Sequence, residues 1–419
     1  LPDPSTIYYL YNSIRLFYEN GGGDAYIVAV NSYGAASGKP LESVDAPLIN
    51  PNVKLADLQA GLALLKNDEE PTMYICPEAT LLSSDDNETL MEYMLLQAND
   101  MQTTVCLFDI IGGRQPDPIL YTNDIETFRN STGSLGLKYG VSYYPFVGTT
   151  IMQSSEIDYT NLFGGNTKDL DALLNPPDAP NASAAKVLSN IKKPSGAPLT
   201  ASQNNSALMN TSKTYKQIMK HVMAEANLLP PSGGMAGVYT TNDNLDGVWN
   251  SPANVSMVGV VSLPIYLSSV QQEDLNVDAV SGKSVNALRF FNGQGILIWG
   301  ARTLDGNSQD WRYISVRRTL TFLEQSCKLA ARTYVFSPND ANTWAAIKGM
   351  ISSCLTGIWK QGGLQGTTPA DAFQVDIGLG STMTAEDLLN GFLKVTVKVA
   401  VVHPAEFIVI TFQQQMAKS

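Results

Sequence analysis

Histidine is almost absent from this chain, and charged residues are scarce. The 419 residues include two histidines, His221 and His403, and charged side chains make up 16% of the total. We expect these two histidines to lie in different domains, so they cannot together build a multi-histidine metal site or a histidine-based catalytic triad. Both are interpreted as structural side chains, and the sequence predicts no enzyme.

Clusters of basic residues and long apolar runs are missing as well. The net charge is −12, and no Lys/Arg run is present that would displace counterions from phosphates, so no nucleic-acid partner is expected. No apolar stretch reaches the 18 residues of a membrane-spanning helix, so direct membrane insertion is not expected either. No basic-then-apolar signal segment stands at the start. The sequence begins at Leu1 rather than Met, which suggests trimming or a missing N-terminal portion.

Cysteine is rare and unclustered. The four cysteines lie singly in apolar stretches, at positions 76, 106, 327 and 354. This spacing fits neither a disulfide framework nor a zinc site. Buried thiols in the reducing bacterial cytoplasm are the favoured interpretation.

Three short motifs resemble ligand sites but lack a required residue. Ser281-Gly282-Lys283-Ser284 has Val277 where a phosphate-binding loop needs its first glycine. The stretch from Asn242 has Ala253 where a calcium loop needs a glutamate. Gly21-Gly22-Gly23 follows a helix rather than a strand. No catalytic, cofactor-binding or metal-ligating residues are therefore predicted.

The first 150 residues alternate between strand and helix patterns, which predicts an α/β domain with parallel strands. Strands are expected over residues 25–30, 73–76, 104–109 and 141–147, and helices over residues 7–18, 55–65 and 89–99. Residues 151–236, rich in Pro, Asn and Ser, are expected to form an irregular insertion with one helix at 215–228.

A second, mixed α/β domain is expected over residues 237–419. Its first long helix, at 311–332, presents one apolar face, formed by Tyr313, Val316, Leu320 and Leu323. Arg317 and Arg318 fall on the other side, available for a partner surface or for ion pairing within the chain. A second helix runs from about 338 to 362.

The C-terminus is expected to be an extended β arm. Val395, Val397 and Val399 alternate with polar residues in a half-buried strand, and Pro404 then interrupts it. The following segment has apolar side chains on both faces, which suits pairing with a neighbouring subunit's sheet. It comprises Glu406, Phe407, Ile408, Val409, Ile410, Thr411, Phe412 and Gln413.

A set of short motifs, taken together, resembles the contractile tail sheath family, which includes phage tail sheaths and contractile injection systems. The similar segments run from Phe17 to Phe412. They include Phe17-Tyr18-Glu19-Asn20-Gly21-Gly22-Gly23, Pro230-Pro231-Ser232-Gly233, Gly247-Val248-Trp249, Phe291-Asn292-Gly293-Gln294-Gly295, Trp311-Arg312-Tyr313 and Phe336-Ser337-Pro338-Asn339-Asp340.

This resemblance implies a structural subunit without cofactors that assembles in the bacterial cytoplasm into a phage-like particle or injection apparatus. Its partners would be itself, in stacked hexameric rings, an inner tube protein, and baseplate and terminator or cap proteins. Contraction would drive the tube through a target envelope, with terminal arms adding strands to neighbours' sheets. Family chains carry a further N-terminal arm that is missing here. A non-contractile scaffold or tube protein is the alternative.

Overall fold

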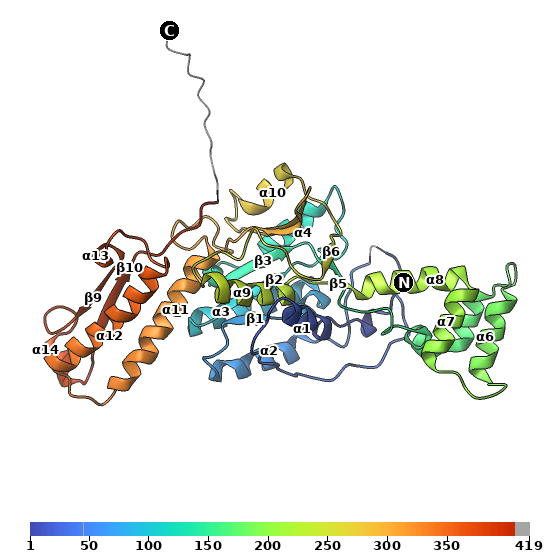
Figure 1. Ribbon diagram of the computed structural model, residues 1–419, viewed down its shortest axis with the longest axis horizontal. Helices are drawn as coiled ribbons and strands as arrows, with labels where there is room; N and C mark the ends of the chain where they lie inside the picture. Colours follow the sequence, from blue (N-terminus) through green and yellow to red (C-terminus); the bar gives the residue numbers. More distant parts are fainter. Residues whose placement is uncertain (45, 407–419) are drawn as a thin grey trace, which may run out of the picture. The chain divides into compact units, whose positions relative to one another are not determined.

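The computed structural model describes residues 1–44 and 46–406, which belong to two compact units (Figure 1). Unit 1 comprises Leu1–Thr241 and Ala253–Asn307, and unit 2 comprises Asn242–Pro252 and the chain from Ser308 onward. The boundary expected at residue 237 is not where the units divide, because the chain returns to unit 1 over residues 253–307 and adds two strands to its sheet.

Unit 1 is built on a five-stranded sheet of order β1-β2-β3-β7-β8. The first four strands run parallel, and β8 closes an antiparallel hairpin with β7 at a turn where Gly293 and Gly295 have φ of 81° and 85°. The predicted α/β fold is confirmed. The strands are β1 (Met73–Ile75), β2 (Val105–Asp109), β3 (Gly140–Tyr144), β7 (Asn286–Phe291) and β8 (Gly295–Trp299).

Helices cover both faces of this sheet. Alternate residues of a strand point to opposite faces, and Cys106 contacts Met94 of α3 while Asp109 bonds Ser232 of α9. α9 also packs closely on α1, since a Cβ built on Gly237 would lie 2.4 Å from the Phe17 carbonyl oxygen. The helices are α1 (Leu10–Glu19), α2 (Leu55–Leu64), α3 (Ser84–Met101), α4 (Tyr121–Asn130), α9 (Ser232–Asp246) and α10 (Ser269–Asn276).

Two predicted strands differ from the structure. The strand expected at 141–147 is split, with β3 followed by β4 (Val147–Thr149), which pairs antiparallel with β5 (Leu228–Leu229) and β6 (Val260–Ser262). The strand expected at 25–30 is not formed: this segment has no regular structure, and Tyr26 and Ile27 are 53% and 59% exposed.

The insertion is a small helical bundle rather than an irregular connection. Four helices follow one another and share a core of Leu170, Leu174, Leu188, Leu208 and Tyr215. The Asn, Ser and Thr residues that indicated loops are helix N-caps, since Asn166, Asn181, Thr200 and Ser212 each accept a backbone hydrogen bond. The helices are α5 (Thr167–Leu174), α6 (Ala182–Lys192), α7 (Ala201–Thr211) and α8 (Lys213–Ala226).

Unit 2 packs two long helices against a two-stranded antiparallel sheet. Both predicted long helices are confirmed, and Val316 and Leu323 are buried in the common core as expected, with Tyr313 and Leu320 packed at its margin. The elements are α11 (Ile314–Ala331), α12 (Ala341–Lys360), α13 (Pro369–Ala372), β9 (Phe373–Ile377), α14 (Ala385–Leu389) and β10 (Val395–Val399). Over the described residues, no helix is both long and apolar enough to cross a bilayer.

Candidate assembly surface

The β9–β10 sheet of unit 2 has open edges. β10 pairs with β9 from Val395 opposite Ile377 to Val399 opposite Phe373, and neither strand has a further partner strand among residues 1–44 and 46–406. α12 packs against β9, with Val375 buried in the core. A sheet of two strands is only marginally stable by itself, so either edge can accept a further strand with a gain in backbone hydrogen bonds.

The chain beyond β10 stays attached to unit 2 as far as the described residues extend. Val401 forms an isolated antiparallel bridge with Leu364, and His403 Nδ1 lies 3.0 Å from the Val401 carbonyl oxygen. Tyr313, at the start of α11, donates from its hydroxyl to Glu406 Oε2 at 2.9 Å. Glu406, the first residue of the predicted arm, therefore lies beside Tyr313. Only this first residue of the arm is described; Phe407, Ile408, Val409, Ile410, Thr411, Phe412 and Gln413 lie outside the described part of the chain.

Arg317 and Arg318 are buried rather than exposed opposite the core face. Arg317 is 2% exposed, pairs with Glu324 at 3.0 Å, and its guanidinium lies 4.7 Å from the ring centroid of Trp311. Arg318 is 8% exposed and forms a bidentate pair with Asp243, at 2.8 and 2.5 Å. The sequence left open whether these arginines face a partner or pair within the chain. In the structure both form ion pairs within the chain.

The Arg318 pair has a mechanical consequence, because Asp243 belongs to the separate chain stretch Asn242–Pro252 of unit 2. The same stretch is held by Ser251, whose hydroxyl lies 3.2 Å from that of Ser315, and by Trp249, which packs on the unit 2 core. A bidentate arginine–carboxylate pair fixes direction as well as distance. These contacts attach the stretch to the N-terminal half of α11.

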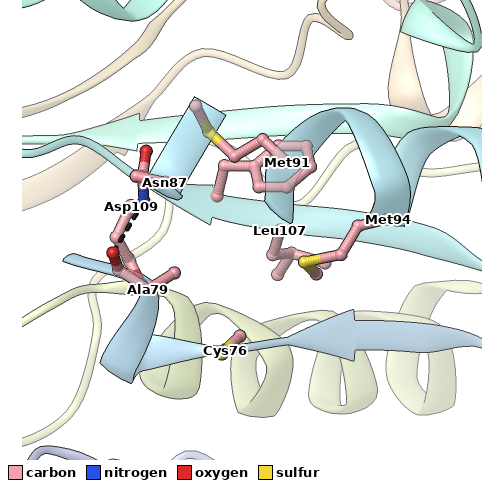
Figure 2. Close-up of a pocket in the computed structure, with 8 residues that line it drawn as sticks. Cys76, Ala79, Asn87, Met91, Met94, Leu107 and Asp109 are labelled. Atoms are coloured by element: carbon pink, nitrogen blue, oxygen red, sulfur yellow. Dashed lines mark hydrogen bonds between the residues drawn. The ribbon is translucent and has the colours of Figure 1, made fainter. Parts of the chain in front are cut away.

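Sequence reasoning missed a polar cluster at the carboxyl ends of β1 and β2 (Figure 2). Asp109 accepts hydrogen bonds from the Ser232 backbone N–H at 2.8 Å and from its hydroxyl at 2.5 Å, at the start of α9. Glu78 accepts from the backbone N–H groups of Tyr9 and Leu10, at the start of α1. Burial raises the pKa of both carboxyl groups, that of Asp109 to about 7, and Glu78 contributes to the Asp109 shift.

This cluster occupies the place where open α/β sheets bind ligands, at the carboxyl ends of parallel strands. Here the N-termini of α1 and α9 lie at that place. Cys76 and Glu78, which follow β1, border a larger cavity of about 650 Å³, whereas the cavity beside Asp109, lined by Cys76, Met91 and Asp109 (Figure 2), has a volume of only about 10 Å³. The small cavity has room for a single water molecule. The carboxylates of Asp109 and Glu78 stabilise helix N-termini.

The remaining motifs have structural roles. Lys283 is buried, with its ammonium donating to the Arg129 carbonyl, and Gly282 turns the chain with φ of 74°. The stretch from Asn242 is the end of α9, where Gly247 has φ of 89°. No group of three or more His, Cys, Asp or Glu suited to a metal occurs in residues 1–44 and 46–406. All four cysteines are free thiols; Cys106 is buried as expected, but Cys354 is exposed.

Comparison with known proteins tests the family resemblance found in the sequence motifs. Residues 307–415 match the family model of the phage tail sheath C-terminal domain. The structure is similar over 96% of the chain to a chain of the anti-feeding prophage baseplate, with a TM-score of 0.61, 26% identity and 80% of that chain covered. Residues 307–415 are thus identified as a phage tail sheath C-terminal domain, and the chain as a whole is similar in fold to proteins of contractile injection systems.

Other known sheath proteins agree with this identification. The helical sheath of the anti-feeding prophage in its contracted state is similar over 96% of this chain and 81% of that chain, with a TM-score of 0.58 and 26% identity. The tail sheath protein of Vibrio phage KVP40 is 29% identical over 139 residues, which are 32% of this chain. That match spans only 20% of the phage protein's own length. The resemblance found in the sequence motifs is confirmed.

Proposed function

We propose that this chain is the structural subunit of a contractile sheath. Copies assemble into hexameric rings, stacked helically around an inner tube, and the polymer shortens to drive the tube through a target envelope. The observation that carries the proposal is the similarity over 96% of the chain to the anti-feeding prophage sheath in its contracted state. The hydrogen bonds by which Glu78 and Asp109 hold the N-termini of α1 and α9 support a structural rather than an enzymatic role for these two carboxyl groups.

The C-terminal arm is the proposed link between subunits. Residues 406–413 add to an edge of the β9–β10 sheet of an adjacent copy, extending a two-stranded sheet to three strands. Main-chain hydrogen bonds of this kind persist while two subunits rotate, provided that the connection between arm and unit bends. The position of Glu406 beside Tyr313 supports an arm that starts from a fixed point on unit 2.

The other partners follow from the same assembly. The inner tube protein templates the extended polymer, and baseplate and terminator or cap proteins bind its two ends. Assembly takes place in the bacterial cytoplasm, and the product is part of a phage-like particle or injection apparatus. No cofactor takes part, since the energy for contraction is stored in the extended polymer.

The decisive experiment is electron microscopy of the chain coexpressed with its tube and baseplate proteins. We expect rods with six-fold rings around a tube, which shorten and widen when triggered by mild denaturant. Rods that assemble but keep their length under every trigger would favour the alternative, a non-contractile scaffold. A chain that remains monomeric with its tube and baseplate present would contradict both.

A further inference from the structure

The outer edge of β1 has no partner strand among the described residues, although a strand-like segment lies beside it. The sheet of unit 1 ends at β1, which pairs with β2 on its other side. A cavity of about 650 Å³ is lined by β1, by α2 and by residues 24–33. Within that segment, Ala25-Tyr26-Ile27-Val28-Ala29-Val30 is rich in β-branched residues, and in the described chain its backbone amides donate no hydrogen bonds.

The contacts of this segment show its direction along β1. Tyr26 donates from its hydroxyl to Glu70, which precedes β1. At the other end, the ring of Tyr33 lies 4.3 Å from that of Tyr8, whose neighbour Tyr9 bonds Glu78 just after β1. Residues 26–33 and 70–78 therefore run in the same direction and have similar lengths. The chain passes from one to the other through α2, which is the order of a parallel strand–helix–strand unit.

The side chains of the segment match two different surroundings. Val28 and Val30 lie against α2, since a Cβ built on Gly61 would be 3.2 and 2.3 Å from their Cγ1 atoms. Ile27 precedes Val28, so in a strand its side chain would point to the opposite face; it is 59% exposed. Phe17 of α1 lines the same cavity from the face opposite α2. In a strand, successive side chains alternate between faces, so Val28 and Val30 would stay on α2 while Ile27 turned toward Phe17.

We propose that residues 25–30 close on β1 as a sixth, parallel strand of the unit 1 sheet and fill this cavity. Closure gives the segment's amides carbonyl partners on β1 and moves Ile27 from solvent into the sheet–helix interface. It also removes an open sheet edge beside exposed apolar residues, which is a site of unwanted pairing between chains. The inference concerns unit 1 alone and does not depend on the proposed sheath role.

Hydrogen exchange, followed by mass spectrometry on the soluble full-length chain, tests the closure. The reference is the connection at residues 195–199, which has no regular structure. If residues 25–30 form a strand, their amides exchange at least about tenfold more slowly than the reference, because strand hydrogen bonds must open first. If they exchange at the reference rate in the unmodified chain, the proposal is wrong.

A pair of proline variants identifies the source of the protection. Val28→Pro removes a donor from the middle of the strand, and protection should then fall to the reference rate at residues 25–30 and decrease at residues 72–75. Ala36→Pro, in the same connection but beyond the segment, should leave both unchanged. Protection that survives Val28→Pro would overturn the proposal. Exchange in α4 reports whether either variant unfolds unit 1, and in that case the unmodified chain alone decides.

Discussion

The five-stranded sheet of unit 1 and the two-stranded sheet of unit 2 differ in how their exposed backbone groups are covered. In unit 1 the carboxyl ends of the parallel strands are covered by α1 and α9, whose N-terminal amides bond Glu78 and Asp109. In unit 2 the β9–β10 sheet has two strands with open edges, and the chain that follows leads into an arm with apolar side chains on both faces. In the proposed assembly, unit 1 supplies a scaffold whose strand ends are bonded to helix N-termini, whereas unit 2 supplies the surface on which copies join.

Removal of the arm is the strongest test of that division. A chain ending at Ala405 should remain folded and soluble but form no long particles, because the strand that joins adjacent copies is gone. Particle length in electron micrographs is the measurement, with circular dichroism to confirm folding. Val409→Pro should have the same effect, and Gln415→Pro, beyond the pairing segment, serves as the control. Normal-length sheaths from the truncated chain would show that the arm is not the linker.

The core of unit 2 should be sensitive on one side of α11. Leu323 is 4% exposed and packs in the core, so Leu323→Ala should cost about 2–5 kcal/mol of unfolding free energy. Leu320 is half-buried at the core margin, so Leu320→Ala should lower the unfolding free energy by a smaller amount. Chemical denaturation followed by tryptophan fluorescence measures both. Equal losses at the two positions would mean that the buried face of α11 has been misassigned.

The two units also differ in how far the sequence predicts them. α12 and β10 have clear periodicity, because one face of each packs on a single core, and both were predicted. In the bundle of α5–α8 only α8 was predicted, as the helix at 215–228; α5, α6 and α7 were not, since they bury few apolar residues each and their N-caps are the residue types of loops. The burial of Arg317 and Arg318 was not predicted, because helical periodicity assumes one buried face, whereas the first turns of α11 are buried all round.

The polar cluster of unit 1 could not be found from spacing alone. Asp109 and Ser232 are 123 residues apart, and no local pattern links them. The one available signal was an acidic residue closing an otherwise apolar strand, which is costly to bury unless something donates to it. The strand expected at 25–30 illustrates the converse case: its composition favours a strand, but among the described residues its amides make no ladder with the neighbouring edge of β1.

Titration of Asp109 should distinguish the closed strand ends of unit 1 from an ordinary surface. Its pKa is about 7 in the folded chain against 3.8 ordinarily, so folding favours the protonated acid. The contribution of Asp109 to the unfolding free energy should therefore be greatest below about pH 4. It should decline as the pH rises from about 4 to about 7. Glu78, whose pKa is also raised, adds a change of the same sign.

Asp109→Asn isolates this contribution. The variant keeps a side-chain oxygen for the Ser232 amide but carries no charge, so it should lose stability less steeply than the unmodified chain between about pH 4 and about pH 7. Urea unfolding at several pH values is the measurement. The control is Asp117→Asn: Asp117 is exposed, and hydrogen bonds from the amides of Leu120 and Ile119 lower its pKa. Parallel profiles for the unmodified chain and Asp109→Asn would refute the assignment.

The smallest expected effect concerns the point where the arm leaves unit 2. Tyr313→Phe removes the hydroxyl that donates to Glu406 but keeps the ring on the core margin, so the unfolding free energy of unit 2 should fall by only about 0.5–1.5 kcal/mol. The effect on assembly should be separable from this loss, because without the Tyr313 contact the arm spends less time in the orientation that reaches a neighbouring copy.

We expect polymerisation of Tyr313→Phe, followed by light scattering, to be slower, with sheaths of normal final length. Glu406→Gln keeps an acceptor for Tyr313 and should polymerise almost as fast as the unmodified chain. If both variants polymerise at the unmodified rate, the Tyr313 contact does not position the arm.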